Sequence, residues 1–151
     1  PSAVASEKFY HIYGIEDESA VTRGEAAAFI VNTFGIKAKP VETFFEDVTE
    51  ETANYKEIMA AFSAGVVSGG GGGNFSPDNK INLMAFCVML CNGAGIEGEE
   101  AAYENVPDWA AKGVAGAVES GLINGIEQEW SGNVTGEMLV TVYKNYIKAD
   151  R

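Results

Sequence analysis

The chain has 151 residues, 46% of them hydrophobic, which is enough for the core of one domain or of an array of small repeats. Its 22 acidic and 10 basic residues give a formal net charge of −12, which argues against nucleic acid or an anionic membrane surface as the main partner. No apolar run has membrane-spanning length and no signal-peptide pattern is present, so we expect no membrane insertion and a chain that is intracellular or already processed.

The clearest predicted element is a helix within residues 21–36. Thr22 is a good N-cap, and Glu25 stands three residues later, so the two can satisfy each other's backbone N–H groups in a capping box. An apolar face follows at helical spacing, and Gly35 is placed to end the helix in a left-handed turn. Arg23 opposes the helix macrodipole, which suggests that it serves an outside partner. A short helical lead is expected before this helix, over residues 6–13.

A second pair of helices is predicted beyond a linker that contains Pro40. Thr49, followed by two acidic residues, is expected to cap the first of them, and Gly65 to end it. Asn82 is expected to cap the second, and the glycines within residues 93–95 to end it. The apolar faces of the two helices comprise Tyr55, Ile58, Met59 and Phe62, and Leu83, Phe86, Cys87, Leu90 and Cys91.

Two features of this pair invite a chemical interpretation. Five consecutive glycines, Gly69–Gly73, predict a flexible loop, but the Lys and Ser or Thr of a phosphate-binding loop do not follow them. Cys87 and Cys91 share a helix face in a geometry unsuited to a disulfide, and no nearby residues complete a zinc site. We interpret them as buried thiols.

The same order of elements then recurs. The segment 103–106 echoes residues 45–48, Pro107 suits a first helical position, and residues 134–135 echo the starts at 21 and 81. The two intervals between these three starts are 60 and 53 residues. A recurring unit of this length predicts an all-α chain of three helix-loop-helix units, at about residues 1–39, 40–97 and 98–151.

At these residues the chain resembles the S-layer homology family. The family's unit runs aromatic-x-Asp-Val, a helix, Gly-Ile, a loop with Phe-x-Pro, and Ile-Thr-Arg-Ala-Glu opening a second helix. The second unit matches best, through residues 45–48, 65–66 and 75–78. The resemblance implies a pseudo-threefold helical prism with the second helices at its centre. It also implies grooves between units that bind a cell-wall polysaccharide, often pyruvylated, whose acidic group is taken by the motif's Arg.

Only the first unit keeps the arginine motif, as residues 22–25. The matching positions are Leu83 and Gly136 in the other units, so two of three grooves lack the cation. A carboxylate is bound well by a guanidinium and poorly by either replacement. The ligand-binding site is therefore expected around Arg23, with Thr22 and Glu25 in the same motif.

Other site residues keep two interpretations each. Asp47 fits the family's Asp position and is also an ordinary cap, and Lys80 is either a displaced cation or a solvated lysine. Trp109 can stack on a sugar or, as we favour, close a helix pair as a half-buried aromatic residue. Trp130 is expected to plug the last loop, where Phe75 lies in the second unit. The sequon at 133–135 is ascribed to chance, because Thr135 is needed as a cap.

An enzyme is not expected, because His11 is the chain's single histidine and no carboxylate pair stands out. No cofactor and no metal are expected. The first hypothesis is a non-catalytic module that anchors a secreted bacterial surface protein to the cell wall or S-layer through a secondary wall polysaccharide, with other surface-layer proteins as further partners. The alternative is a degenerate module used for protein contacts or as a spacer.

Overall fold

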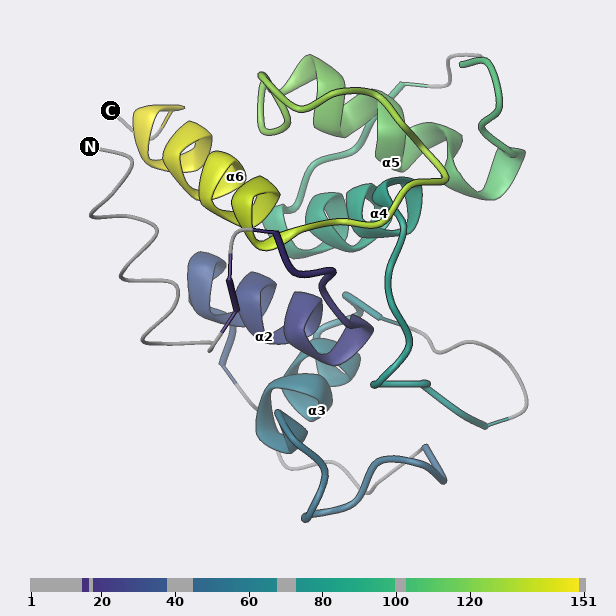
Figure 1. Ribbon diagram of the computed structural model, residues 1–151, viewed down its shortest axis with the longest axis vertical. Coiled ribbons are helices and arrows are strands. Elements are labelled where there is room, and N and C mark those ends of the chain that lie inside the picture. The colour runs from purple at the N-terminus through teal and green to yellow at the C-terminus, as the bar shows by residue number, and fades with distance from the viewer. Residues whose placement is uncertain (1–14, 17, 38–44, 68–72, 100–102, 150–151) are drawn as a thin grey trace.

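A computed structural model describes residues 15–16, 18–37, 45–67, 73–99 and 103–149. The described residues form the helices α2 (Arg23–Phe34), α3 (Tyr55–Ser63), α4 (Leu83–Ala94), α5 (Asp108–Glu119) and α6 (Gly136–Ala149), and no strand (Figure 1). The predicted all-α class is thus confirmed. The predicted lead helix at 6–13 and the glycine loop, apart from Gly73, lie outside the described residues.

The start of α2 has the predicted capping box. Thr22 N donates to Glu25 Oε1 at 2.9 Å, and Glu25 N donates to Thr22 Oγ1 at 3.1 Å. The predicted stops of α2 and α4 are also present, because Gly35 and Gly95 both adopt the left-handed conformation, with φ of 65° and 70°.

Two predicted helix starts were wrong. Thr49 does not cap α3: its hydroxyl accepts from Glu51 N and its N–H donates to Thr52 Oγ1, so it closes a turn, and the helix begins only at Tyr55. Pro107 is the N-cap of α5 rather than its first helical residue, with an extended ψ of 163°. The hydroxyl of Thr49 can bond in a turn as well as at a helix start, so its presence did not fix where α3 begins. The fixed φ of Pro107 suits the N-cap as well as the first helical position, so it did not fix where α5 begins.

Three hydrogen bonds join the segments that precede α2, α4 and α6 into a closed ring. Val21 N donates to Val134 O at 2.8 Å, Val134 N to Ile81 O at 3.0 Å, and Ile81 N to Val21 O at 3.0 Å. All three side chains are buried. The ring satisfies backbone groups that would otherwise be buried without partners, so it brings the three helix starts together.

The first residues of these helices make a second cycle of hydrogen bonds, in which the donors follow the opposite order around the three units. Arg23 N donates to Asn79 O, Leu83 N to Gly132 O, and Gly136 N to Ser19 O. Each helix therefore begins against the loop that precedes another of the three. This cyclic bonding is compatible with the pseudo-threefold prism, and the complete prism stays a prediction.

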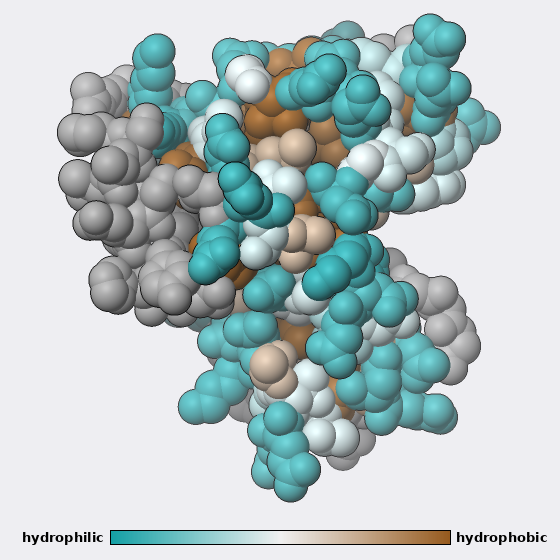
Figure 2. All heavy atoms as spheres, in the orientation of Figure 1, coloured by the Kyte–Doolittle hydropathy of each residue, from teal (hydrophilic) through white to brown (hydrophobic). Residues whose placement is uncertain are grey.

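The helices pack through small residues at their closest contacts. Helix α4 packs against α2 and α5, and α2 also packs against α3. A Cβ atom at Gly113 would lie 2.7 Å from Val88 Cα, so α5 approaches the backbone of α4 more closely than any other residue allows. Figure 2 shows mostly hydrophilic residues on one face, with hydrophobic residues visible in the seams. None of the helices in the described part is long and apolar enough to cross a membrane.

Candidate functional site

Arg23 lies in the first turn of α2 and reaches across to the loop before α4. Its Nε donates to Phe75 O at 2.9 Å, and its Cζ lies 4.8 Å from the centroid of the Phe75 ring. Burial lowers the pKa of Arg23, while the nearby charge of Asp47 raises it, and a guanidinium stays protonated at neutral pH in either case. The contact with Phe75 fixes the orientation of the cation. Its two terminal nitrogens make no hydrogen bond to any described residue.

Asp47 holds the other side of the same loop. Its Oδ1 accepts from Phe75 N at 2.9 Å and its Oδ2 accepts from Ser76 N at 2.7 Å. Ser76 has a positive φ of 62°, which these bonds help to maintain. The carboxylate is thus used inside the protein, and it positions the Phe75 carbonyl that in turn orients Arg23. Asp47 was expected as a site residue or an N-cap, and the structure gives it this loop-fixing role.

A pocket of about 180 Å³ opens beside Arg23. Its wall combines three parts of the chain: the start of α2, the segment that follows α3, and one face of α4, with the first turn of α5 at the rim. The residues that line it are Arg23, Val66, Val67, Ala85, Val88, Met89, Asn92 and Trp109. We call it the Arg23 pocket. The structure therefore brings two of the predicted site residues, Arg23 and Trp109, to one cavity.

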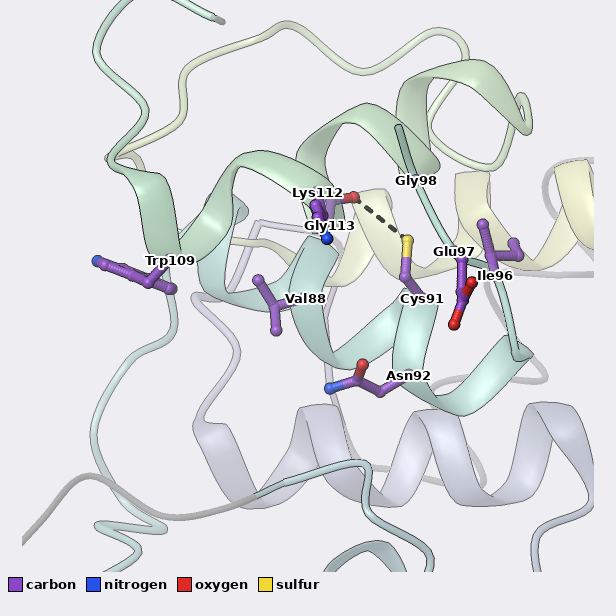
Figure 3. Close-up of a pocket in the computed structure, with 9 residues that line it drawn as sticks. All are labelled: Val88, Cys91, Asn92, Ile96, Glu97, Gly98, Trp109, Lys112 and Gly113. Atoms are coloured by element: carbon purple, nitrogen blue, oxygen red, sulfur yellow. Dashed lines mark hydrogen bonds between the residues drawn. The ribbon is translucent and has the colours of Figure 1, made fainter. Parts of the chain in front are cut away.

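A second pocket of about 310 Å³ continues along α4 (Figure 3). It shares Val88, Asn92 and Trp109 with the Arg23 pocket, and it is otherwise lined by Cys91, Ile96, Glu97, Gly98, Lys112 and Gly113. We call it the Lys112 pocket. Trp109 lies at one end of it and the segment 96–98 at the other, with α4 and α5 as its sides. The two pockets are adjacent, because three residues line both.

Trp109 is 62% exposed, so the favoured interpretation of a half-buried aromatic closing a helix pair was wrong. An indole with most of its surface in water, at the rim of two pockets, offers an apolar face to a ligand. Trp130, by contrast, is buried and meets the Tyr103 ring edge-on with centroids 6.0 Å apart, which confirms that it plugs the last loop.

The remaining predicted site residues lie outside both pockets. Thr22 and Glu25 bond to each other in the capping box, so they position α2. Lys80 is exposed, and its backbone pairs with that of Thr22 in an isolated bridge. Direct ligand contact by these three side chains stays a prediction.

The positions equivalent to Arg23 offer no room for a cation. Leu83 is 1% exposed and belongs to the core. At Gly136, a Cβ atom would collide with the carbonyl oxygen of Glu16 and lie 3.0 Å from its carbon. The asymmetry expected from the sequence therefore has a physical basis, because one position is filled by the core and the other is closed by the chain itself.

The cysteines are buried thiols, as predicted. Burial raises the pKa of Cys87 to about 12, with a smaller effect from Cys91, and raises the pKa of Cys91 to about 11. Cys91 Sγ donates to Gly113 O at 3.2 Å. Neutral, hydrogen-bonded thiols of this kind are poor nucleophiles. No group of three or more His, Cys, Asp or Glu side chains in the described ranges is arranged to hold a metal ion.

Sequence reasoning missed Asn92 and assigned Phe75 only to a motif. Asn92 Nδ2 donates to Val66 O at 3.3 Å, which ties α4 to the end of the α3 segment along the pocket wall. Its position on α4, one helical turn beyond Val88, was the signal that both residues share a face. Phe75 is fully buried. It orients Arg23 through two contacts: its backbone carbonyl accepts from Nε, and its ring lies under the guanidinium.

Comparison with known proteins places part of this chain in a known class. Residues 44–87 match the S-layer homology domain, a class of module that generally anchors proteins to cell walls. The chain is 29% identical to an endoglucanase of Bacillus sp. (strain KSM-635) over 83 residues, which are 54% of this chain and 9% of that protein. It is 30% identical to the exoglucanase XynX of Acetivibrio thermocellus over 123 residues, which are 73% of this chain and 11% of that protein. The chain thus spans about a tenth of the length of these relatives.

Proposed function

We propose, from the S-layer homology domain at residues 44–87, that this chain is a non-catalytic anchor that holds a protein on the bacterial cell wall by binding a secondary wall polysaccharide. The observation that carries the proposal is the Arg23 pocket, in which a positioned guanidinium and an exposed indole face one cavity. The cation suits an acidic substituent, such as a pyruvate ketal, and the indole suits the apolar face of the sugar that bears it.

The geometry of Arg23 determines how the acid would bind. Because Nε is already bonded to Phe75 O, the two terminal nitrogens form the edge that a carboxylate can approach, and both can donate to it. The half-buried position strengthens such a bond, because less water competes for the charges. The protein has a net charge of −12, which repels an anionic polysaccharide at long range. The attraction of Arg23 for the carboxylate must offset this repulsion.

A pull-down on purified bacterial sacculi, with and without their secondary polysaccharide, tests this function. We expect the protein to sediment only with sacculi that retain the polymer. Arg23→Ala should weaken binding at least tenfold, since a charge-assisted contact contributes about 1.5–3 kcal/mol. Arg23→Lys should restore part of the binding, because an ammonium does not form the paired fork. Lys56→Ala, which removes an exposed cation on α3 that lines neither pocket, is the control for loss of a positive charge, and it should bind almost normally. Full binding by Arg23→Ala would refute the proposed site.

The second function, a module for protein contacts or a spacer, is favoured by Leu83 and Gly136. Two of the three equivalent helix starts hold no cation and have no room for one, so the fold persists where the ligand group is lost. Sedimentation that is equal with and without the polysaccharide, or absent in both, would favour this function over glycan binding.

A further inference from the structure

The Lys112 pocket is larger than the Arg23 pocket. Binding of the acidic substituent at Arg23 does not explain why this second pocket is present. Cavities that bind small molecules usually measure about 300–1,000 Å³. The Arg23 pocket, at about 180 Å³, lies below this range, whereas the Lys112 pocket, at about 310 Å³, reaches it. A ligand of the usual size that begins at Arg23 can therefore extend past Trp109 into the second pocket.

The Lys112 pocket combines donors and acceptors without an excess of charge. Glu97 and Lys112 are both exposed, and neither forms an ion pair with a described residue. The amide oxygen of Asn92 and the backbone N–H groups of Glu97 and Gly98 also make no hydrogen bond to the described part of the chain. These groups match hydroxyls, which both donate and accept. A lining with one cation and one anion has no net charge, which favours a neutral sugar over a second acidic one.

The depth of this pocket depends on glycines. A Cβ atom at Gly98 would collide with Lys112 O, and one at Gly116 would lie 2.9 Å from Cys91 Sγ, so the segment after α4 lies directly on the backbone of α5. Gly113 brings α4 and α5 equally close. The base of the Lys112 pocket is therefore a tight backbone contact that keeps its shape without a ligand, which lowers the entropic cost of binding.

We propose that the Lys112 pocket is a subsite for a neutral sugar linked to the acidic sugar at Arg23, with Trp109 between the two. The inference rests on the proposed function and adds to it: the preferred ligand is an oligosaccharide of at least two residues that runs along α4. Trp109 contacts both sugars because it lines both pockets. Specificity for the neighbouring sugar then comes from Glu97, Lys112 and Asn92.

Calorimetric titration with three synthetic probes tests the subsite. The first is a pyruvylated hexopyranoside, and the other two are disaccharides that extend it by one neutral hexose on either side. We expect one disaccharide to bind about three- to tenfold more tightly than the monosaccharide, as one or two neutral hydrogen bonds would produce. Glu97→Ala and Lys112→Ala should each remove most of this gain and leave the affinity for the monosaccharide within about twofold. Lys56→Ala, which removes an exposed cation on α3, is the control for general charge effects.

The outcomes separate the two proposals. Binding of the monosaccharide with no gain for either disaccharide would overturn the subsite and keep the proposed function. A gain that survives in Glu97→Ala and Lys112→Ala would also overturn it, because the second sugar would lie elsewhere. No binding of any probe would refute the acidic-glycan site at Arg23, and the subsite with it.

Discussion

The starts of α2 and α6 share a backbone plan but differ in what they can bind. In both, a threonine precedes the helix, and the first helical N–H donates to the loop of another unit, from Arg23 to Asn79 and from Gly136 to Ser19. At Arg23 the side chain passes over Phe75 into a pocket, whereas at Gly136 the neighbouring Glu16 carbonyl occupies the place of a Cβ atom. The same backbone hydrogen bond is thus present at both helix starts, but only the start of α2 has room for a side chain. Whether a helix start can form a binding groove therefore depends on how far the neighbouring loop lies from it.

This comparison predicts that the third unit cannot be given a binding side chain by substitution. Gly136→Ala should lower the free energy of unfolding by about 3 kcal/mol, the upper end for overpacking, because the collision is with backbone. Gly24→Ala is the matched control in α2, where the nearest atom to the added Cβ is Pro77 O at 3.3 Å, and its effect should stay within about 1 kcal/mol. Urea denaturation measures both. An unchanged midpoint for Gly136→Ala would show that the loop at Glu16 moves aside easily.

The next prediction concerns the loop that orients the Arg23 side chain, a role that the equivalent loop at Gly136 does not have because glycine has no side chain. Asp47→Ala leaves the N–H groups of Phe75 and Ser76 without their acceptor, and it should cost about 2 kcal/mol of stability. Because the Phe75 carbonyl then loses its fixed position, glycan affinity should fall as well. Asp78→Ala, at an exposed position in the same turn, is the control and should change neither quantity. Retained affinity in a destabilised Asp47→Ala protein would mean that Arg23 is oriented without the loop.

Sequence reasoning recovered the parts of this chain that local rules determine. Helix caps at Thr22 and Asn82 and stops at Gly35 and Gly95 follow from bonds within a few residues, so pattern alone located them. The start of α3 was missed because Thr49 has the same local preference for a turn as for a cap. Trp109 was misjudged because its exposure depends on how α5 packs against the other helices, which no local pattern encodes.

A third prediction separates α4 from α2 by their response to alkaline pH. Burial raises the pKa of Cys87 to about 12 and that of Cys91 to about 11, from an ordinary thiol value of 9.0. Above about pH 9 the unfolded chain releases protons that the folded chain keeps, so the free energy of unfolding falls as pH rises. The slope is about 1.4 kcal/mol per pH unit for each thiol, up to about pH 11. At the corresponding positions α2 has Ala27 and Val31, which do not titrate.

Denaturation midpoints measured from pH 8 to pH 10.5 test the slope, and variants isolate the contribution of each thiol. Cys91→Ala should remove about half of the slope, and Cys87→Ala combined with Cys91→Ala should remove all of the part due to thiols, although both variants lose some packing at every pH. The comparison is between slopes, so this constant loss does not affect it. A slope equal to that of the unmodified chain in the double variant would show that other groups produce the alkaline effect.

The smallest expected difference lies in the caps of the three equivalent helices. At α2 the bonding is reciprocal, between Thr22 and Glu25, whereas at α4 the Asn82 side chain accepts from Ala85 N with no return bond, because alanine has no acceptor. At α6 the corresponding bond, from Met138 N to Thr135 Oγ1, is 3.4 Å long.

Thr22→Ala and Asn82→Ala should therefore each cost about 1 kcal/mol, and Thr135→Ala less, because a longer bond stabilises less. Glu25→Ala, which removes only the return bond at a partly exposed position, should cost about 0.5 kcal/mol. Melting midpoints of the four variants give the order directly, and a Thr135→Ala loss as large as that of Thr22→Ala would show that bond length at these caps does not set their contribution.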